Sequence, residues 1–155
     1  MVPMNPETAK AMNQALGYLS RRAKTIFEMN GYLEKKGFET QVTNQVINLL
    51  IAEKYLDDKV FAKQFINNRI QYKPKSKFAL AYELKRKGID SALSEELLDS
   101  YDDQELAFKA VGPKIKAWKH LDKETRQKKL MNYLNYRGFN YRICKTVWEQ
   151  IKNEF

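Results

Sequence analysis

Three glycines, Gly37, Gly88 and Gly138, divide the chain into similar thirds, 51 and 50 residues apart. The residues around them repeat in register. A leucine stands four positions before each glycine, a lysine or arginine directly before it, and a large apolar residue directly after it. This many matched offsets indicate an internal repeat, and a period near fifty residues is typical of stacked helical units.

Each glycine is predicted to end one helix just before the next one begins. Glycine after the last helical residue adopts the left-handed backbone conformation with little strain, and a cation beside it suits the negative end of the helix. Asp90 and Asn140 are good caps for the helix that follows, whereas Glu39 is a poorer one. Apolar residues then recur at helical spacing in all three thirds.

A further helix is predicted ahead of each of these pairs. Asn5-Pro6-Glu7 has the pattern of a helix start and opens a helix to about Ser20. Asp57-Asp58 and Asp102-Asp103 open the equivalent helices of the other two thirds. Gly112-Pro113 interrupts the last of them. Because proline inside a helix costs about 3 kcal/mol, we expect a kink there or a new start at Pro113.

The sequence therefore predicts an all-α fold of three tandem three-helix repeats in an elongated, curved array. The repeats are expected at residues 1–56, 57–101 and 102–155, and stacking should complete a core that one repeat alone cannot bury. The sequence contains no run of about 18 apolar residues, so no membrane span is predicted. The first ten residues show no secretory signal, and a single cysteine suits a reducing cytoplasm.

Charge favours an anionic partner, either nucleic acid or an acidic protein surface. The net charge is +9, and residues 59–82 carry six cations and no acid, whereas residues 89–108 carry seven acids and no cation. If the repeats stack regularly, the basic segments form a stripe along one edge. The alternative is that they are ordinary solvated helix faces.

Nothing in the sequence favours catalysis. His120 and Cys144 are single residues of their type, whereas a zinc site needs about four ligands. Cys144 occupies the position of Thr43 and Ser94 in the other repeats, so it is expected to be a small packing residue. No glycine-rich phosphate loop occurs. We therefore predict a non-enzyme without a cofactor, a metal ion or a small-molecule substrate.

Residues 69–77 (RIQYKPKSK) interleave cations with a tyrosine and a proline. Tyr72 could stack on a base or a guanidinium, and the lysines could meet phosphates or carboxylates. The alternative is a polar loop with Tyr72 packed into the seam between repeats.

The helix–turn–helix pattern is also typical of proteins in which a recognition helix reads DNA. The first repeat offers exposed polar positions at Gln41, Thr43, Asn44 and Asn48. The second offers Glu95, Glu96 and Asp99, which would repel phosphate. A packing role explains all three pairs, whereas groove reading explains at most one. A stand-alone DNA-binding module therefore remains the alternative function, with an adaptor for an acidic protein as a third.

Several segments resemble the RecX family, regulators of the RecA recombinase. They are residues 15–22 (ALGYLSRR), 33–38 (LEKKGF), 55–58 (YLDD), 83–90 (ELKRKGID) and 133–141 (YLNYRGFNY), with Phe61-Ala62 and Asn68-Arg69 between them. The matches span nearly the whole chain, in order and at the family's spacing. The family's fold is three tandem three-helix repeats, in agreement with the periodicity.

The resemblance implies a non-enzymatic inhibitor that lodges in the groove of the RecA–DNA filament and curbs ATP hydrolysis and strand exchange in DNA repair and the SOS response. The expected partner is the RecA filament, with DNA bound weakly or within the filament, and the expected state is a monomer. Candidate contacts follow from charge placement and motif position. They are Arg21, Arg22, Arg69, Tyr72, Lys73, Lys75, Arg86 and Lys87.

Overall fold

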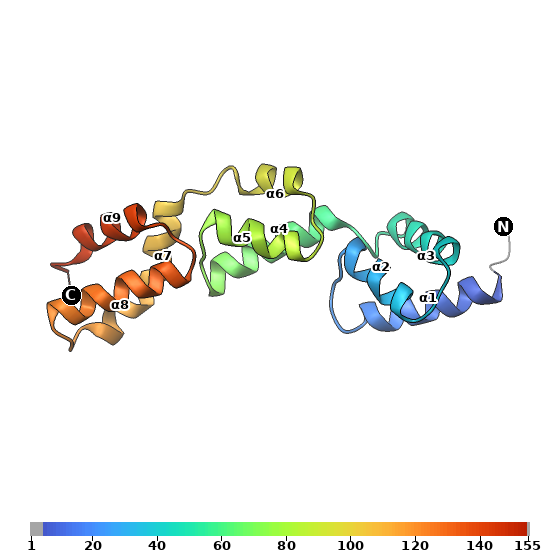
Figure 1. The fold of residues 1–155 in the computed structure, drawn as a ribbon, viewed down its shortest axis with the longest axis horizontal. Helices are drawn as coiled ribbons and strands as arrows, with labels where there is room; N and C mark the ends of the chain where they lie inside the picture. Colours follow the sequence, from blue (N-terminus) through green and yellow to red (C-terminus); the bar gives the residue numbers. More distant parts are fainter. Residues whose placement is uncertain (1–4, 155) are drawn as a thin grey trace. The chain divides into compact units, whose positions relative to one another are not determined.

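The computed structural model describes residues 5–154 and contains nine α-helices and no strand in that range. The helices are α1 Pro6–Leu19, α2 Ile26–Lys35, α3 Thr40–Ala52, α4 Asp58–Tyr72, α5 Lys77–Arg86, α6 Ser91–Leu98, α7 Asp103–Trp118, α8 Lys123–Tyr136 and α9 Tyr141–Ile151 (Figure 1). The predicted all-α fold is confirmed. Residues 1–4 and 155, the ends of the predicted first and third repeats, lie outside the described residues.

Most helix starts follow the predicted capping pattern. Asn5, Asp102 and Asn140 each accept a hydrogen bond from a backbone N–H of the first turn, at 2.8, 3.1 and 2.9 Å. Glu39 precedes α3 without a side-chain cap, as expected for a poorer capping residue. Local sequence thus sets the helix boundaries.

Of the kink or new start predicted at Pro113, the new start is wrong and the kink stays a prediction. Helix α7 runs without a break from Asp103 to Trp118, with the proline inside it. Ala110 and Val111, just before the proline, are buried, and Ile115 and Trp118 pack on the same core beyond it. Apolar packing on both sides therefore holds the helix together across the one hydrogen bond that proline cannot make.

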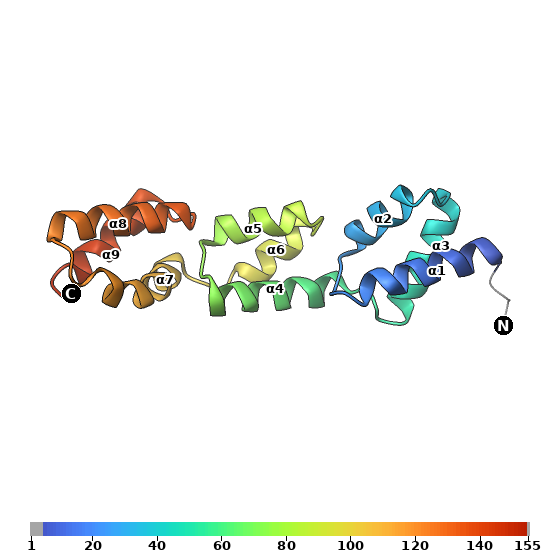
Figure 2. The same ribbon diagram turned by 90° about the horizontal axis from the view of Figure 1, so that it is seen from below.

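The chain divides into two compact units. One contains α1–α3, the start of α4 and residues 84–93; the other contains residues 64–83 and the chain from residue 94 onward, including α7–α9. Figures 1 and 2 show α1–α3 as one group and α7–α9 as another. The division into repeats at 1–56, 57–101 and 102–155 stays a prediction.

The repeated positions form the core. The leucines four residues before each glycine, Leu33, Leu84 and Leu134, are completely buried. Cys144 is buried as well, with its thiol 3.6 Å from the Phe139 carbonyl oxygen. Its packing role is confirmed. Thr43 is also completely buried, so its expected exposure to a DNA groove is wrong: the residue lies on the packing face of α3.

The three glycine turns share one geometry. Gly37, Gly88 and Gly138 have positive φ angles of 91°, 80° and 92°. In each turn the N–H of the residue after the glycine donates to the carbonyl of the leucine four residues before the glycine, at 3.3, 3.0 and 3.0 Å. This is the Schellman pattern, which satisfies carbonyls at a helix end.

Two contacts between neighbouring repeats are built in the same way; we call each a repeat joint. In the first, the Thr25 hydroxyl donates to the Lys87 carbonyl at 2.6 Å, and the Ile26 N–H donates to the Asp58 carboxylate at 2.9 Å. Both bonds lie within the first unit. The N-terminus of α2 is thereby seated on the turn that contains Gly88.

The second repeat joint lies within the other unit and seats the N-terminus of α5 on the Gly138 turn. The Ser76 N–H donates to the Arg137 carbonyl at 3.1 Å, and the Lys77 N–H donates to the Asp103 carboxylate at 2.8 Å. Asp58 and Asp103 occupy the first positions of α4 and α7. These acids therefore serve the preceding repeat as well as their own helix starts.

Close approach at the repeat joints requires glycine. A Cβ atom on Gly88 would overlap the side chain of Phe27, and one on Gly138 would lie 2.7 Å from the Ala79 Cβ. A Cβ atom on Gly37 would meet nothing within 4 Å. For folding, Gly37 is therefore needed only for its backbone conformation, whereas the other two glycines are needed for conformation and for space.

Alanine substitutions should separate these two requirements. We expect Gly37→Ala to lower the free energy of unfolding by about 1–2 kcal/mol, the strain of a left-handed residue that carries a Cβ. Gly138→Ala adds overpacking worth about 1–3 kcal/mol, so its loss should be clearly larger. Chemical denaturation of both variants measures the difference. Equal losses would contradict the close contact at the second repeat joint.

Candidate partner-binding surfaces

The eight residues predicted to contact a partner fall into two sets, one in each compact unit. Arg21, Arg22, Arg86 and Lys87 belong to the first unit, and Arg69, Tyr72, Lys73 and Lys75 belong to the second. Within each set some side chains are exposed and others are held by carboxylates of the protein itself.

Glu83 holds two cations of the second set. The Arg69 Nε donates to the Glu83 carboxylate at 2.8 Å, and the Lys75 ammonium forms a short ion pair with its other oxygen. The Arg69 guanidinium also lies 4.6 Å from the centre of the Phe65 ring. Arg69 and Lys75 therefore already have an internal anionic partner.

Glu83 was not among the residues predicted from the sequence, although a signal was present. Tyr32, Glu83 and Tyr133 each stand five residues before a glycine, so an acid replaces an aromatic residue only in the middle repeat. Burial raises the pKa of Glu83, but hydrogen bonds from Lys75 and Arg69 outweigh burial and leave that pKa below its ordinary value. The carboxylate is therefore charged at neutral pH.

Tyr72 and Lys73 project from the end of α4. Tyr72 is 72% exposed, so the alternative in which it packs into the seam between repeats is wrong. Pro74 and Ser76 are buried just beyond it, and Arg137 donates to the Pro74 carbonyl at 3.3 Å. The segment is thus anchored at two points while Tyr72 and Lys73 face solvent.

In the first unit, Arg21 and Arg22 are exposed after the end of α1. The neighbouring Lys24 is buried, with its ammonium 4.2 Å from the centre of the Tyr18 ring. Burial, reinforced by repulsion from Arg22, lowers the pKa of Lys24. The two arginines therefore face solvent, whereas Lys24 packs over the Tyr18 ring.

Lys87 and Arg86 are adjacent but differ in environment. The Lys87 ammonium lies 3.6 Å from the Glu28 carboxylate and 5.9 Å from the centre of the Phe61 ring, and its carbonyl belongs to the first repeat joint. Arg86, the last residue of α5, is exposed. Lys87 thus contributes to the structure of the repeat joint.

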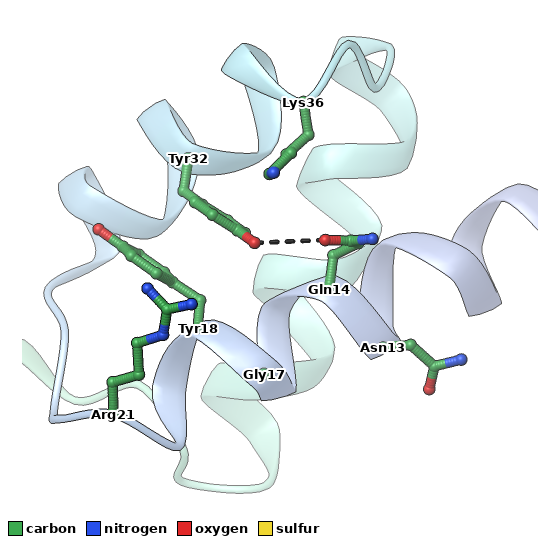
Figure 3. Close-up of a pocket in the computed structure, with 7 residues that line it drawn as sticks. All are labelled: Asn13, Gln14, Gly17, Tyr18, Arg21, Tyr32 and Lys36. Atoms are coloured by element: carbon green, nitrogen blue, oxygen red, sulfur yellow. Dashed lines mark hydrogen bonds between the residues drawn. The ribbon is translucent and has the colours of Figure 1, made fainter.

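A surface pocket of about 400 Å³ lies between α1 and α2. Its lining residues are Asn13, Gln14, Gly17, Tyr18, Arg21, Tyr32 and Lys36 (Figure 3). The Tyr18 and Tyr32 rings are stacked with centroids 4.0 Å apart, and the Tyr32 hydroxyl donates to the Gln14 side chain at 3.3 Å. The lining contains two cations and no carboxylate, so it suits an anionic group. Of these lining residues, only Arg21 was predicted from the sequence as a contact.

Residues 5–154 contain neither a candidate metal site nor a candidate membrane span. No group of three or more His, Cys, Asp or Glu side chains is arranged to hold a metal ion. None of the helices in that range has the length and apolar character needed to cross a membrane.

The ion pairs of Glu83 with Arg69 and Lys75 predict how the stability of the protein depends on pH. Glu83→Gln should lower the free energy of unfolding at pH 7 by about 1–2 kcal/mol, allowing for partial exposure of the three side chains. The pKa of Glu83 is lower in the folded protein than in the unfolded chain, where it is about 4.3. The parent's extra free energy of unfolding is therefore fully present above about pH 4.3 and is lost as the pH falls through the pKa of the folded protein. Denaturation curves at neutral and acidic pH measure this. An advantage that is constant with pH would contradict the ion pairs.

Known proteins similar to this chain share one family. Residues 11–50 match the family model of the first three-helix domain of RecX, and residues 57–98 match that of the second. The regulatory protein RecX of Chlorobium limicola is 35% identical over 136 residues, which cover 88% of this chain and 86% of the relative. The regulatory protein RecX of Prosthecochloris aestuarii is 34% identical over 145 residues, which cover 94% and 95%.

A solved structure supports the fold. The crystal structure of RecX from Lactobacillus salivarius matches with a TM-score of 0.76 at 24% sequence identity, covering 94% of this chain and 96% of that one. The sequence relatives, the two matched domains and the all-helical fold agree, and the chain belongs to the RecX family of regulatory proteins.

Proposed function

We propose that this protein is a non-enzymatic, cytoplasmic regulator that binds the RecA–DNA filament as a monomer and restrains its ATPase activity and strand exchange. Membership of the RecX family is the observation that carries the proposal. The net charge of +9 supports it, because both RecA carboxylates and DNA phosphates are anionic partners.

The distribution of the predicted contacts suggests a division of roles. Five of the eight side chains are exposed: Arg21, Arg22, Tyr72, Lys73 and Arg86. The other three, Arg69, Lys75 and Lys87, have carboxylate partners within the protein. We assign direct contact with the filament to the exposed five and the positioning of the surrounding backbone to the other three.

Exposed cations of this kind act mainly on the rate and salt dependence of association. They steer the protein toward an anionic surface, and their contribution weakens as ionic strength rises. Tyr72 adds a ring that can stack on a base or on a guanidinium of the partner. Inhibition then follows from occupation of the filament and requires no catalytic group.

Reversing the charge of Lys73 tests the direct contact. Lys75 is less suitable, because a carboxylate there would lie beside Glu83 and disturb the fold. We expect Lys73→Glu to raise the concentration needed for half-maximal inhibition of RecA ATPase by about tenfold, equivalent to about 1.4 kcal/mol. Lys145→Glu, at an exposed position of α9, makes the same change in net charge and serves as the control. Equal inhibition by parent and Lys73→Glu would remove this loop from the contact.

A titration with and without RecA separates the proposed function from its alternatives. We expect weak binding to naked DNA and tight binding to assembled RecA–DNA filaments at physiological ionic strength. Fluorescence anisotropy with labelled DNA measures both. Tight, salt-sensitive binding to DNA alone would favour the stand-alone DNA-binding module, and binding to neither would favour an adaptor for another acidic protein.

A further inference from the structure

The turn around Gly37 has the same geometry as two turns on which another helix of the chain is bound. Gly88 and Gly138 each receive the N-terminus of a helix from the preceding repeat, through hydrogen bonds to the carbonyl of the residue before the glycine. Gly37 has a φ of 91°, close to their 80° and 92°, and the same closing hydrogen bond. We call Lys36, Gly37 and Phe38 the Gly37 turn.

The Gly37 turn is open within the described part of the chain. A Cβ atom on Gly37 would meet nothing within 4 Å, whereas Phe27 fills that space at Gly88, and Ser76 and Ala79 fill it at Gly138. Lys36 and Gly37 are both exposed. The molecule therefore presents, on its surface, a glycine turn of the kind that twice holds the start of a helix internally.

We propose that the Gly37 turn is a docking site for the first turn of a helix in a subunit of the RecA filament. The incoming helix begins with serine or threonine and carries an acidic residue three positions later. This inference rests on the proposed function and deepens it by naming one surface of this protein and the chemistry of the segment that it binds.

The first repeat joint shows how these residues bind a glycine turn, whereas in the second Ser76 binds through its backbone N–H and is followed three positions later by Ala79. Thr25 accepts a hydrogen bond from the Glu28 N–H at 3.1 Å and donates its own hydroxyl to the Lys87 carbonyl at 2.6 Å. It thus caps its helix and binds the turn at the same time. The Glu28 carboxylate lies 3.6 Å from the Lys87 ammonium.

Lys36 occupies the position of Lys87 in the Gly37 turn, directly before the glycine. Its side chain is exposed, so an acid three residues into an incoming helix can pair with it as Glu28 pairs with Lys87. The positive N-terminus of that helix also faces carbonyls at the negative C-terminus of α2. Charge and hydrogen bonding therefore favour the same occupant.

A second copy of this chain is a poorer occupant. The described helix starts capped by threonine or serine are those of α2 and α5, and both are seated in repeat joints. Helix α8, their counterpart in the third repeat, begins 15 residues before its glycine instead of 11 and is capped by Asp122. Helix α8 is thus about one turn longer at its N-terminus, and its cap is an aspartate instead of a serine or threonine.

Two variants and a matched control test the docking site in the full-length protein. Asparagine is the other residue found at left-handed helix ends, so Gly37→Asn should preserve the turn while its side chain fills the open space. Lys36→Glu reverses the proposed charge contact. Lys35→Glu changes the neighbouring exposed lysine by the same charge and serves as the control.

The measurement is the Kd of each variant for preassembled filaments of RecA on single-stranded DNA, with thermal unfolding to confirm that each variant folds. We expect Gly37→Asn and Lys36→Glu to weaken binding at least tenfold, and Lys35→Glu less than threefold. If Gly37→Asn does not fold, the comparison of Lys36→Glu with Lys35→Glu decides.

The outcomes distinguish the docking site from the proposed function. If the parent binds filaments and both test variants bind equally well, the docking inference is overturned and the proposed function stands. Equal losses for the two lysine variants overturn it as well, since they reduce the effect to general charge. If the parent itself does not bind filaments, both proposals are overturned.

Discussion

A helix N-terminus seated on a glycine turn is the contact on which the repeat structure depends. Helix ends leave backbone N–H and carbonyl groups without intrahelical partners. At both repeat joints these groups find partners across the joint, as when the Lys87 carbonyl accepts from the Thr25 hydroxyl and the Ile26 N–H donates to the Asp58 carboxylate. The arrangement requires a residue without a side chain at the turn. Gly88 and Gly138 therefore define the repeat in sequence and in space.

The same contact explains why neighbouring cations have different roles. A cation directly before a glycine suits the helix end, and Lys87 also meets a carboxylate from the preceding repeat. Lys75, next to the start of α5, is held by Glu83. Arg86 and Lys73, close in sequence to these two, are exposed. The residues that we propose as partner contacts are thus interleaved with those that stabilise the repeat joints.

The repeats keep a common frame while their surfaces differ. Five residues before each glycine, the first repeat has Tyr32 stacked on Tyr18, the second has Glu83 in its ion pairs, and the third has Tyr133, whose ring meets Trp118 edge-on with centroids 5.7 Å apart. The shared helical structure of the repeats depends on apolar and backbone contacts, which are kept when the residue five positions before the glycine differs. Each repeat can therefore present a different chemistry to a partner.

Helices, caps and glycine turns could be predicted from the sequence, because they depend on residues a few positions apart and on a pattern that occurs three times. The burial of Cys144 could be predicted from its position in the repeat. The family resemblance rested on short motifs that occur in order along the chain. Other features depend on residues that only packing brings together. The Thr25–Lys87 bond spans 62 positions, Tyr72 is exposed because Pro74 and Ser76 are anchored beside it, and α7 continues through Pro113 because its core packs on both sides. Periodicity gives the apolar face of a helix but not the residues of another repeat that meet it, so only the tertiary structure decided which cations are paired within the protein and which are exposed.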